Sequence, residues 1–253
     1  MIADRHLHTG FSEDSNEDPK RAIEKAISLG MKDIYITDHY DMDFPDGHFM
    51  FDTGRYFDEL ERLKECYADR IAVHAGVELG LKPEIGGRLL EFIGENPFEY
   101  IIGSVHLIDE KDPYYRDEFD MSDRDFYRRY FEEVLLCLDK CSGFDTLGHL
   151  DYVVRYGYKK DEEYSYEDNA DLIDEILKRI IASDIALEIN TAGLRKGLRF
   201  AHPYPQILKR YRKLGGVKLA MGSDAHSAED IGSKFDETMD YLKKFSFSYA
   251  DFI

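Results

Sequence analysis

The chain has 253 residues, a length that suits one large α/β domain, and no linker rich in glycine, serine or proline interrupts it. Hydrophobic residues make up 43% of the sequence and aromatic residues 13%, which is enough for a sizeable core. A formal net charge of −19 argues against a nucleic-acid groove, because such a groove needs a basic stripe. No apolar run is long enough to cross a membrane, and no signal-peptide pattern follows Met1. We therefore expect a cytoplasmic protein with no membrane partner, made of a single domain over residues 1–253.

The predicted elements alternate along the chain. Short apolar runs end in polar residues, and each is followed by a stretch with helical periodicity. Strands are expected over residues 3–9, 33–37, 71–77, 100–105, 146–148, 186–189 and 217–221. Helices are expected over residues 19–29, 54–68, 87–94, 122–141, 166–183, 204–214 and 228–244. Strands joined by helical crossovers predict a parallel sheet, and seven such repeats predict a barrel-like α/β fold.

The first predicted strand carries two histidines, His6 and His8. Alternate side chains of a strand point the same way, so both imidazoles lie on one face. Two adjacent imidazoles are suited to binding a metal ion. Asp224 and His226 repeat this spacing after the last predicted strand. The two ends of the sequence therefore each supply half of a candidate metal site.

Further side chains able to bind a metal follow the carboxyl ends of the other strands, where barrels of this kind place their chemistry. The complete candidate set is His6, His8, Asp14, His39, Glu78, His106, His149, Asp224 and His226. A mixture of imidazoles and carboxylates without thiolates suits Zn, Mn or Fe rather than a structural zinc site. Nine candidates exceed the needs of one ion, so we expect two or three divalent ions that share a bridging carboxylate. Such a cluster is typical of hydrolytic sites, because it activates water and holds a phosphoryl group.

Six motifs, in this order, resemble the polymerase-and-histidinol-phosphatase (PHP) family. They are His6-x-His8-Thr9, Thr37-Asp38-His39, Glu78, Ser104-Val105-His106, Gly148-His149 and Gly222-Ser223-Asp224-Ala225-His226. The match runs through nearly the whole chain. The length, Asp14 and the arginine-containing loops resemble the monofunctional histidinol-phosphatase branch. This resemblance implies a distorted seven-stranded (β/α)7 TIM-like barrel and a trinuclear metal centre.

The resemblance also implies how the ligands divide among three ions. The first ion would take His6, His8, Glu78 and Asp224. The second would take Glu78 as a bridge, with His106 and His149. The third would take Asp14, His39 and His226. Other branches of the family have a histidine at the position of Asp14, so Glu13 or Asp18 remains an alternative ligand.

Two arginines stand out on a mostly acidic rim, Arg155 after the fifth strand and Arg195 after the sixth. A guanidinium group matches phosphate oxygens with two parallel hydrogen bonds, and the resemblance also points to arginines on these loops as phosphate ligands. The alternative is a surface salt bridge, and Lys196 and Arg199 are rivals of Arg195. His202 is a further candidate for substrate binding, although the start of a helix also explains the prolines beside it.

Asp38 is predicted either to support the metal ligands from behind or to be a proton carrier, with a cap or turn role as the alternative. We expect Asp38, Arg155 and Arg195 to take part in catalysis. The resulting hypothesis is a metal-dependent phosphomonoesterase, a histidinol-phosphatase of histidine biosynthesis, in which a metal-bridging hydroxide attacks phosphorus. One alternative is a PHP phosphoesterase that acts on nucleotides or oligonucleotide ends. Another is a non-catalytic metal-binding regulatory module, against which the complete ligand set argues.

Overall fold

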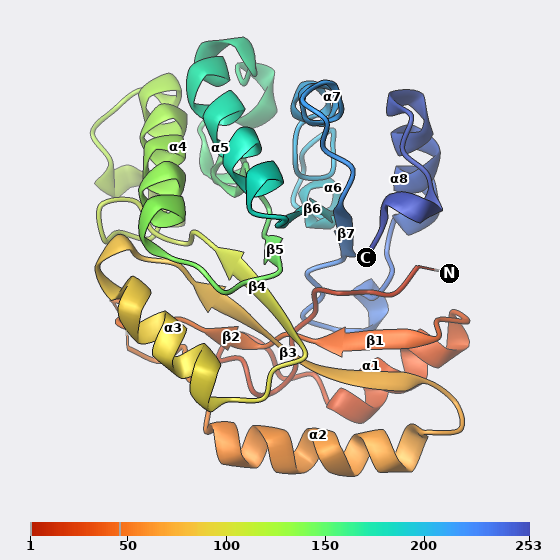
Figure 1. Cartoon of the computed structure of the whole chain (residues 1–253). Helices are drawn as coiled ribbons and strands as arrows, with labels where there is room; N and C mark the ends of the chain where they lie inside the picture. The colour runs from red at the N-terminus through yellow and green to blue at the C-terminus, as the bar shows by residue number, and fades with distance from the viewer. Residues whose placement is uncertain (1, 46) are drawn as a thin grey trace.

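A parallel sheet forms the centre of the computed structural model, which describes residues 2–45 and 47–253 (Figure 1). Its strands are β1 (Asp33–Ile36), β2 (His39–Tyr40), β3 (Ala72–Gly80), β4 (Tyr100–Ser104), β5 (Thr146–Leu147), β6 (Ala186–Asn190) and β7 (Leu219–Gly222). The order is β1-β3-β4-β5-β6-β7, and β2 also pairs with β3. All of these pairs are parallel, as the predicted helical crossovers require.

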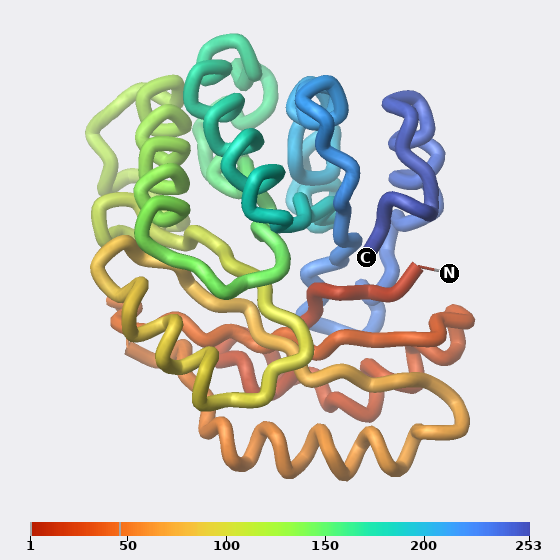
Figure 2. Tube along the Cα trace, in the orientation of Figure 1, coloured from red at the N-terminus to blue at the C-terminus, as the bar shows by residue number. Residues whose placement is uncertain are grey.

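The N-terminal segment closes this sheet by lying between β7 and β1 (Figure 2). Arg5 N–H donates to the carbonyl of Met221, and Tyr35 N–H donates to the carbonyl of Asp4. The prediction of a regular strand over residues 3–9 was wrong, because only isolated bridges form there. Leu7 N–H donates to the Thr37 hydroxyl instead of a backbone carbonyl, which interrupts the ladder. The predicted distorted seven-stranded barrel is nevertheless confirmed, with His39–Tyr40 as its additional short strand.

The helices lie outside the curled sheet (Figure 1). They are α1 (Pro19–Ser28), α2 (Thr53–Tyr67), α3 (Gly86–Glu95), α4 (Asp123–Lys140), α5 (Ala170–Ala182), α6 (Ala192–Arg195), α7 (Pro205–Lys213) and α8 (Phe235–Leu242). The Asp18 side chain caps the amino end of α1 by accepting from Lys20 N–H, and Gly30 adopts φ +74° just after its carboxyl end. None of the described helices combines the length and the apolar character that a membrane span requires.

Two helix predictions need correction. The stretch predicted as one helix over residues 228–244 begins with a 3₁₀ turn, Ala228–Asp230, and α8 starts only at Phe235. Gly232 and Lys234 both have φ +66° between these pieces, which breaks the helical path. The helix predicted over residues 166–183 is likewise preceded by a 3₁₀ turn, so α5 starts at Ala170. The short helix α6 was not predicted.

Side chains of the strands alternate between two clusters. Those of one face pack against the helices in the main core, as Ile34, Val77 and Ile101 do. Those of the other face point into the barrel, where a small cluster fills the amino end. That cluster consists of Tyr35, Tyr100, Ile102, Ala186 and Ala220. Continuing the same alternation toward the carboxyl ends of β3 and β6 turns Glu78 and Glu188 into the barrel interior.

Candidate metal centre

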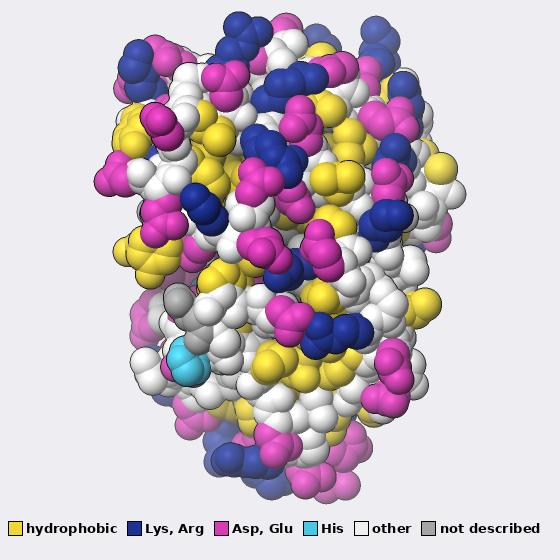
Figure 3. Space-filling view, turned by 90° about the vertical axis from the view of Figure 1, so that its left-hand side faces the viewer, with side chains coloured by type: hydrophobic (Ala, Val, Ile, Leu, Met, Phe, Trp, Pro, Cys, Tyr) yellow, Lys and Arg dark blue, Asp and Glu magenta, His cyan; other side chains and the backbone are white. Residues whose placement is uncertain are grey.

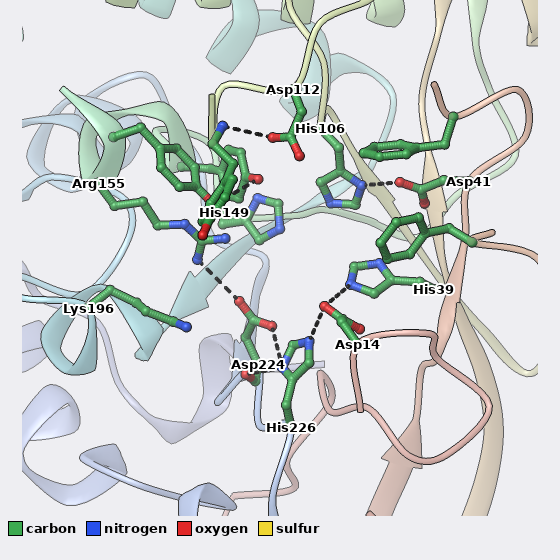
Figure 4. Close-up of a pocket in the computed structure, with 15 residues that line it drawn as sticks. Asp14, His39, Asp41, His106, Asp112, His149, Arg155, Lys196, Asp224 and His226 are labelled. Atoms are coloured by element: carbon green, nitrogen blue, oxygen red, sulfur yellow. Dashed lines mark hydrogen bonds and ion pairs between the residues drawn. The ribbon is translucent and has the colours of Figure 1, made fainter. Parts of the chain in front are cut away.

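The nine predicted metal ligands converge at the carboxyl ends of the strands. Six of them line a cavity of about 480 Å³, namely Asp14, His39, His106, His149, Asp224 and His226 (Figure 4). The other three, His6, His8 and Glu78, are fully or almost fully buried. Residues from the first strand segment to the loop after β7 thus meet at one rim, as the barrel topology requires.

Glu78 lies at the centre of this group, at the end of β3. Its Oε2 is 3.2 Å from His6 Nε2, 3.5 Å from His8 Nε2 and 3.0 Å from His39 Nδ1. Its Oε1 is 3.0 Å from His149 Nε2 and 3.2 Å from His106 Nε2. One carboxylate therefore contacts five imidazoles, an arrangement suited to a bridging ligand.

The charge of Glu78 is set by its neighbours. Burial alone would raise the pKa of this carboxyl, but attraction to His6, His39 and His106 outweighs burial and holds the pKa well below its usual range. In the same way, burial would lower the pKa of His6, but the charges of Glu78 and Glu188 raise it well above its usual value. The low pKa of Glu78 keeps its carboxylate ionised near neutral pH, so it offers a negative charge to a cation.

Asp224 and Asp14 bring carboxylates to the other side of the cluster. Asp224 Oδ1 is 3.4 Å from His8 Nε2 and 3.7 Å from His226 Nδ1. Asp14 Oδ2 is 3.1 Å from His226 Nε2 and 3.8 Å from His39 Nε2 (Figure 4). The rings of His39 and His226 each stack on His8 with centroids 4.2 Å apart. The structure thus brings Asp14, rather than Glu13 or Asp18, next to the two histidines predicted to share its ion.

The donor atoms of this cluster fit divalent metal ions. Several buried donor atoms have no hydrogen-bond partner, namely His6 Nε2, His8 Nε2, His39 Nδ1 and Glu78 Oε2. Buried polar atoms in proteins are normally satisfied, so a common partner for these atoms is expected. Four groups with donor atoms within 4.8 Å of one another could each hold an ion: His6, His8 and Asp224; His6, Glu78 and His149; His39, Asp41 and His106; and His8, His39 and His226.

A second layer of residues orients three of the imidazoles. His6 Nδ1 donates to Glu188 Oε1 over 2.6 Å, and His106 Nδ1 donates to Asp41 Oδ2 over 2.6 Å. His8 Nδ1 lies 3.1 Å from the Ser12 hydroxyl. A hydrogen bond at one ring nitrogen fixes the ring and turns the other nitrogen toward the metal.

Glu188, Ser12 and Asp41 were not among the predicted site residues. Glu188 did carry a signal, since it is a charged residue inside the otherwise apolar strand Ala186–Ile189. Ser12 lies in a loop four residues after His8, and no periodic pattern predicts where a loop side chain points, so no comparable signal existed there.

Asp38 is buried and takes a turn role rather than a place in the cavity wall. Its carboxylate accepts from the backbone N–H and hydroxyl of Thr9 and from the backbone N–H and hydroxyl of Ser12. Because the Ser12 hydroxyl donates to Asp38, its oxygen is left to accept from His8 Nδ1. The structure therefore places Asp38 behind Ser12 and His8, and it is not among the residues that line the cavity.

Arg155 lines the cavity, as predicted for a phosphate ligand (Figure 4). Its guanidinium carbon lies 4.1 Å from the centroid of the Tyr152 ring, and Nη1 is 3.8 Å from Asp224 Oδ2. Its Nε is buried without a hydrogen-bond partner. The guanidinium is thus held beside the candidate ligands with hydrogen-bonding capacity left over.

Arg195 is not among the residues that line the cavity. Its Nη2 donates to the carbonyls of Ser223 and Asp224 over 2.7 and 3.2 Å, while Nη1 is buried without a partner. Of the two rivals named from the sequence, Lys196 lines the cavity and Arg199 forms an ion pair with Asp161. Arg155 and Lys196 therefore line the cavity, whereas Arg195 contacts the backbone of Ser223 and Asp224.

His202 does not reach the cavity. It is 0% exposed, and its Nδ1 donates to Asp151 Oδ1 over 2.6 Å. It is absent from the residues that line the cavity. This placement does not indicate the direct contact with substrate that the sequence suggested.

Comparison with known proteins agrees with this geometry. The PHP domain profile matches residues 4–192. A probable histidinol-phosphatase of Clostridium acetobutylicum is 37% identical over 94% of this chain and 92% of the relative. The histidinol-phosphatase of Lactococcus lactis is 33% identical over 96% of this chain and 91% of the relative. A crystal structure of the L. lactis histidinol phosphate phosphatase, complexed with zinc, L-histidinol and phosphate, covers 98% of this chain and 94% of its own, with a TM-score of 0.89 and 30% identity. The ligand cluster, the barrel and these matches together show that this chain belongs to the PHP domain family.

Proposed function

We propose that this protein is a metal-dependent phosphomonoesterase that hydrolyses L-histidinol phosphate to L-histidinol and phosphate. The observation that carries this proposal is the cluster of imidazoles around Glu78, which opens into a cavity beside Arg155. Such a site can hold several cations next to a phosphate-binding guanidinium. The histidinol-phosphatases that resemble the chain over nearly its full length support the choice of substrate.

The ligand sets described above would hold two or three ions of the Zn, Mn or Fe type, with Glu78 as the bridge. Bound divalent ions supply a nucleophile from water at neutral pH and withdraw charge from phosphoryl oxygens. The chain itself contributes an ionised Glu78 and rings held by Glu188, Asp41 and Ser12. These contacts fix the donor atoms before substrate arrives, so little reorganisation is needed during the reaction.

Arg155 would bind and orient the phosphoryl group from the side opposite His39 (Figure 4). Its unpartnered Nε and its position against Tyr152 provide a fixed, permanently charged donor. Arg195 does not line the cavity, and its Nη2 holds the backbone of Ser223 and Asp224. Its buried Nη1 has no partner and is the atom through which Arg195 would act as a second phosphate ligand. Charge neutralisation by such groups is a large part of phosphoryl-transfer catalysis.

The rest of the cavity wall suits an amino alcohol with an imidazole ring. It combines the carboxylate of Asp112 with aromatic side chains, which are Phe44, Phe49, Tyr114, Tyr152 and Tyr156. Aromatic faces and carboxylates favour a cationic or polar organic group. A small phosphomonoester of this chemistry therefore fits both parts of the site.

A small-molecule substrate also agrees with the charge of the molecule. Acidic and basic side chains are interspersed on the face in Figure 3, and the net charge of the chain is −19. Nucleic acids bind to clustered basic residues, which this face does not present. We therefore do not propose an oligonucleotide substrate.

The direct test is an assay of phosphate release by purified protein loaded with Zn or Mn. The panel contains L-histidinol phosphate, a nucleoside monophosphate, a sugar phosphate and phosphoserine. We expect kcat/KM for L-histidinol phosphate to exceed the other values by at least about 100-fold, since polar groups built for one substrate reject others strongly. Equal, slow turnover of all four compounds would contradict the substrate assignment.

A further inference from the structure

A buried histidine–aspartate pair lies outside the cavity lining and has no role in the mechanism above. His202 and Asp151 are both 0% exposed. His202 Nδ1 donates to Asp151 Oδ1 over 2.6 Å, and Tyr204 N–H donates to Asp151 Oδ2 over 2.7 Å. Burying two polar side chains is costly unless they form a specific contact, so the pair needs an explanation.

The pair connects the two segments that carry the arginines. Asp151 directly precedes the 3₁₀ helix Tyr152–Tyr156, which contains Arg155, and its carbonyl accepts from Val154 N–H. His202 is tied to the end of β6, because its backbone exchanges two hydrogen bonds of 2.8 Å with Asn190. The helix α6, which contains Arg195, begins two residues after Asn190.

The imidazole of His202 also sets the position of α6. A Cβ placed on Gly193 would lie 3.2 Å from His202 Cδ2 and 3.3 Å from Nε2, so the ring packs directly against the backbone of this helix. Asn190 Oδ1 accepts from Ala192 N–H, which fixes the start of the same helix. One face of His202 thus supports the Arg195 helix, while its Nδ1 holds the Arg155 segment through Asp151.

We infer that Asp151 and His202 are positioning residues that set the distance between Arg155 and Arg195 for the phosphoryl group. This inference rests on the proposed function, because it assumes that both arginines bind phosphate. Neither residue of the pair lines the cavity, so neither touches the substrate. Loss of the pair should weaken binding of the phosphoryl group more than binding of the histidinol part, because most of the aromatic wall lies on other segments.

Two amide variants of His202 test whether the hydrogen-bond donor to Asp151 must lie at the position of Nδ1. In His202→Asn the amide nitrogen replaces Nδ1 and can still donate to Asp151. In His202→Gln the amide lies near the position of Nε2, so the donor is displaced. We expect His202→Gln to raise KM for L-histidinol phosphate and the inhibition constant of inorganic phosphate by about 10- to 100-fold. For His202→Asn both constants should stay within about threefold of the wild-type values.

The inhibition constant of L-histidinol is the readout that distinguishes positioning from general damage. It should change by less than about threefold in both variants, because Phe44, Phe49 and Tyr114 lie on other segments and only Tyr152 and Tyr156 belong to the 3₁₀ helix that Asp151 precedes. Zinc content and the far-UV circular dichroism spectrum check folding and metal loading. A matched control is His74→Asn, which alters another histidine–aspartate pair, with Asp33, near the amino end of β3. It should leave all three constants unchanged.

Parallel changes in the phosphate and histidinol constants of His202→Gln would overturn the inference, as would a wild-type phosphate constant in a folded His202→Gln variant. If His202→Gln does not fold, a large loss of phosphate affinity in His202→Asn overturns it instead. Failure of the proposed function is a separate outcome. It would show as the absence of L-histidinol phosphate hydrolysis by the wild-type protein, whereas binding of inorganic phosphate to the zinc-loaded protein can still be measured by calorimetry.

Discussion

His74 and Glu78 lie on the same face of β3, one near each end of the barrel interior, and their surroundings differ. At the amino end, His74 stacks on Tyr35 with centroids 4.2 Å apart and its Nε2 donates to Asp33. Tyr100 likewise has a partner there, the Thr146 hydroxyl at 2.7 Å. At the carboxyl end, Glu78 contacts five imidazoles, and several of the donor atoms have no hydrogen-bond partner.

The alternation of side chains along β3 therefore serves two purposes. Polar groups that satisfy each other stabilise the fold, whereas polar groups left unsatisfied at the rim are poised for cations and substrate. Substitutions at the carboxyl end should therefore change metal binding and turnover, and substitutions at the amino end should change only stability.

The largest effect is expected for Glu78→Gln. The amide removes the negative charge of Glu78, which five imidazoles contact. It also removes the carboxylate that is proposed to bridge the ions. We expect kcat/KM to fall by at least about 1,000-fold and the metal content per chain to drop. Phosphate release and elemental analysis of the same preparation measure both quantities. A variant with full activity and full metal content would refute the role of Glu78.

The next largest effect is expected for Glu188→Gln. This residue accepts from His6 Nδ1 and from the backbone N–H of His149, both over 2.6 Å, but it is not proposed to bind a metal. Loss of its charge should reduce metal affinity or kcat/KM by about 10- to 100-fold. Competition with a chelator of known affinity measures the metal affinity of the variant. Unchanged metal affinity together with unchanged turnover would contradict a role for Glu188 in orienting the metal ligands.

Metal binding should also depend on pH in a defined direction. Burial would lower the pKa of His106, but Asp41 and Glu78 raise it well above its usual value, and Glu78 and Glu188 do the same for His6. Metal must displace these protons, so affinity should increase as pH rises from 6 to 8, by about tenfold per unit for each proton displaced. Calorimetry in buffers of different ionisation enthalpy counts the protons. Binding without proton release would contradict these shifts.

The smallest effect is expected at the amino end, where His74→Leu removes the pair with Asp33. Both residues are partly exposed, so the free energy of unfolding should fall by only about 0.5–1 kcal/mol. Metal content and kcat should stay at wild-type values. Urea denaturation and steady-state kinetics check the two halves of this prediction, and a loss of activity would show that the two ends are coupled.

Most of the barrel could be predicted from the sequence, and the nine predicted ligands lie together at one rim, whereas Asp41 of the group with His39 and His106 was not among them. Strand periodicity placed Glu78, His106 and His149 at strand ends, and a parallel topology then requires them to meet. The spacing of His6 and His8 was informative because a local rule, alternation along an extended segment, decides their direction.

The contacts behind the ligands could not be predicted in the same way. The hydrogen bond of Ser12 to His8 and the pair of Asp151 with His202 depend on how loops pack, and no local pattern specifies that packing. The prediction of a regular strand over residues 3–9 was wrong for a similar reason, because the Thr37 hydroxyl accepts a hydrogen bond from Leu7 N–H. This contact joins residues 30 positions apart in the sequence and overrides the local preference for a strand.

The central claim is that the cluster around Glu78 is a hydrolytic centre that needs more than one metal ion. The most direct measurement titrates metal-free protein with zinc or manganese and follows bound ions per chain together with phosphate release from L-histidinol phosphate. The account predicts two to three ions per chain and activity that emerges only when at least two are bound. Full activity at zero or one ion per chain would contradict it.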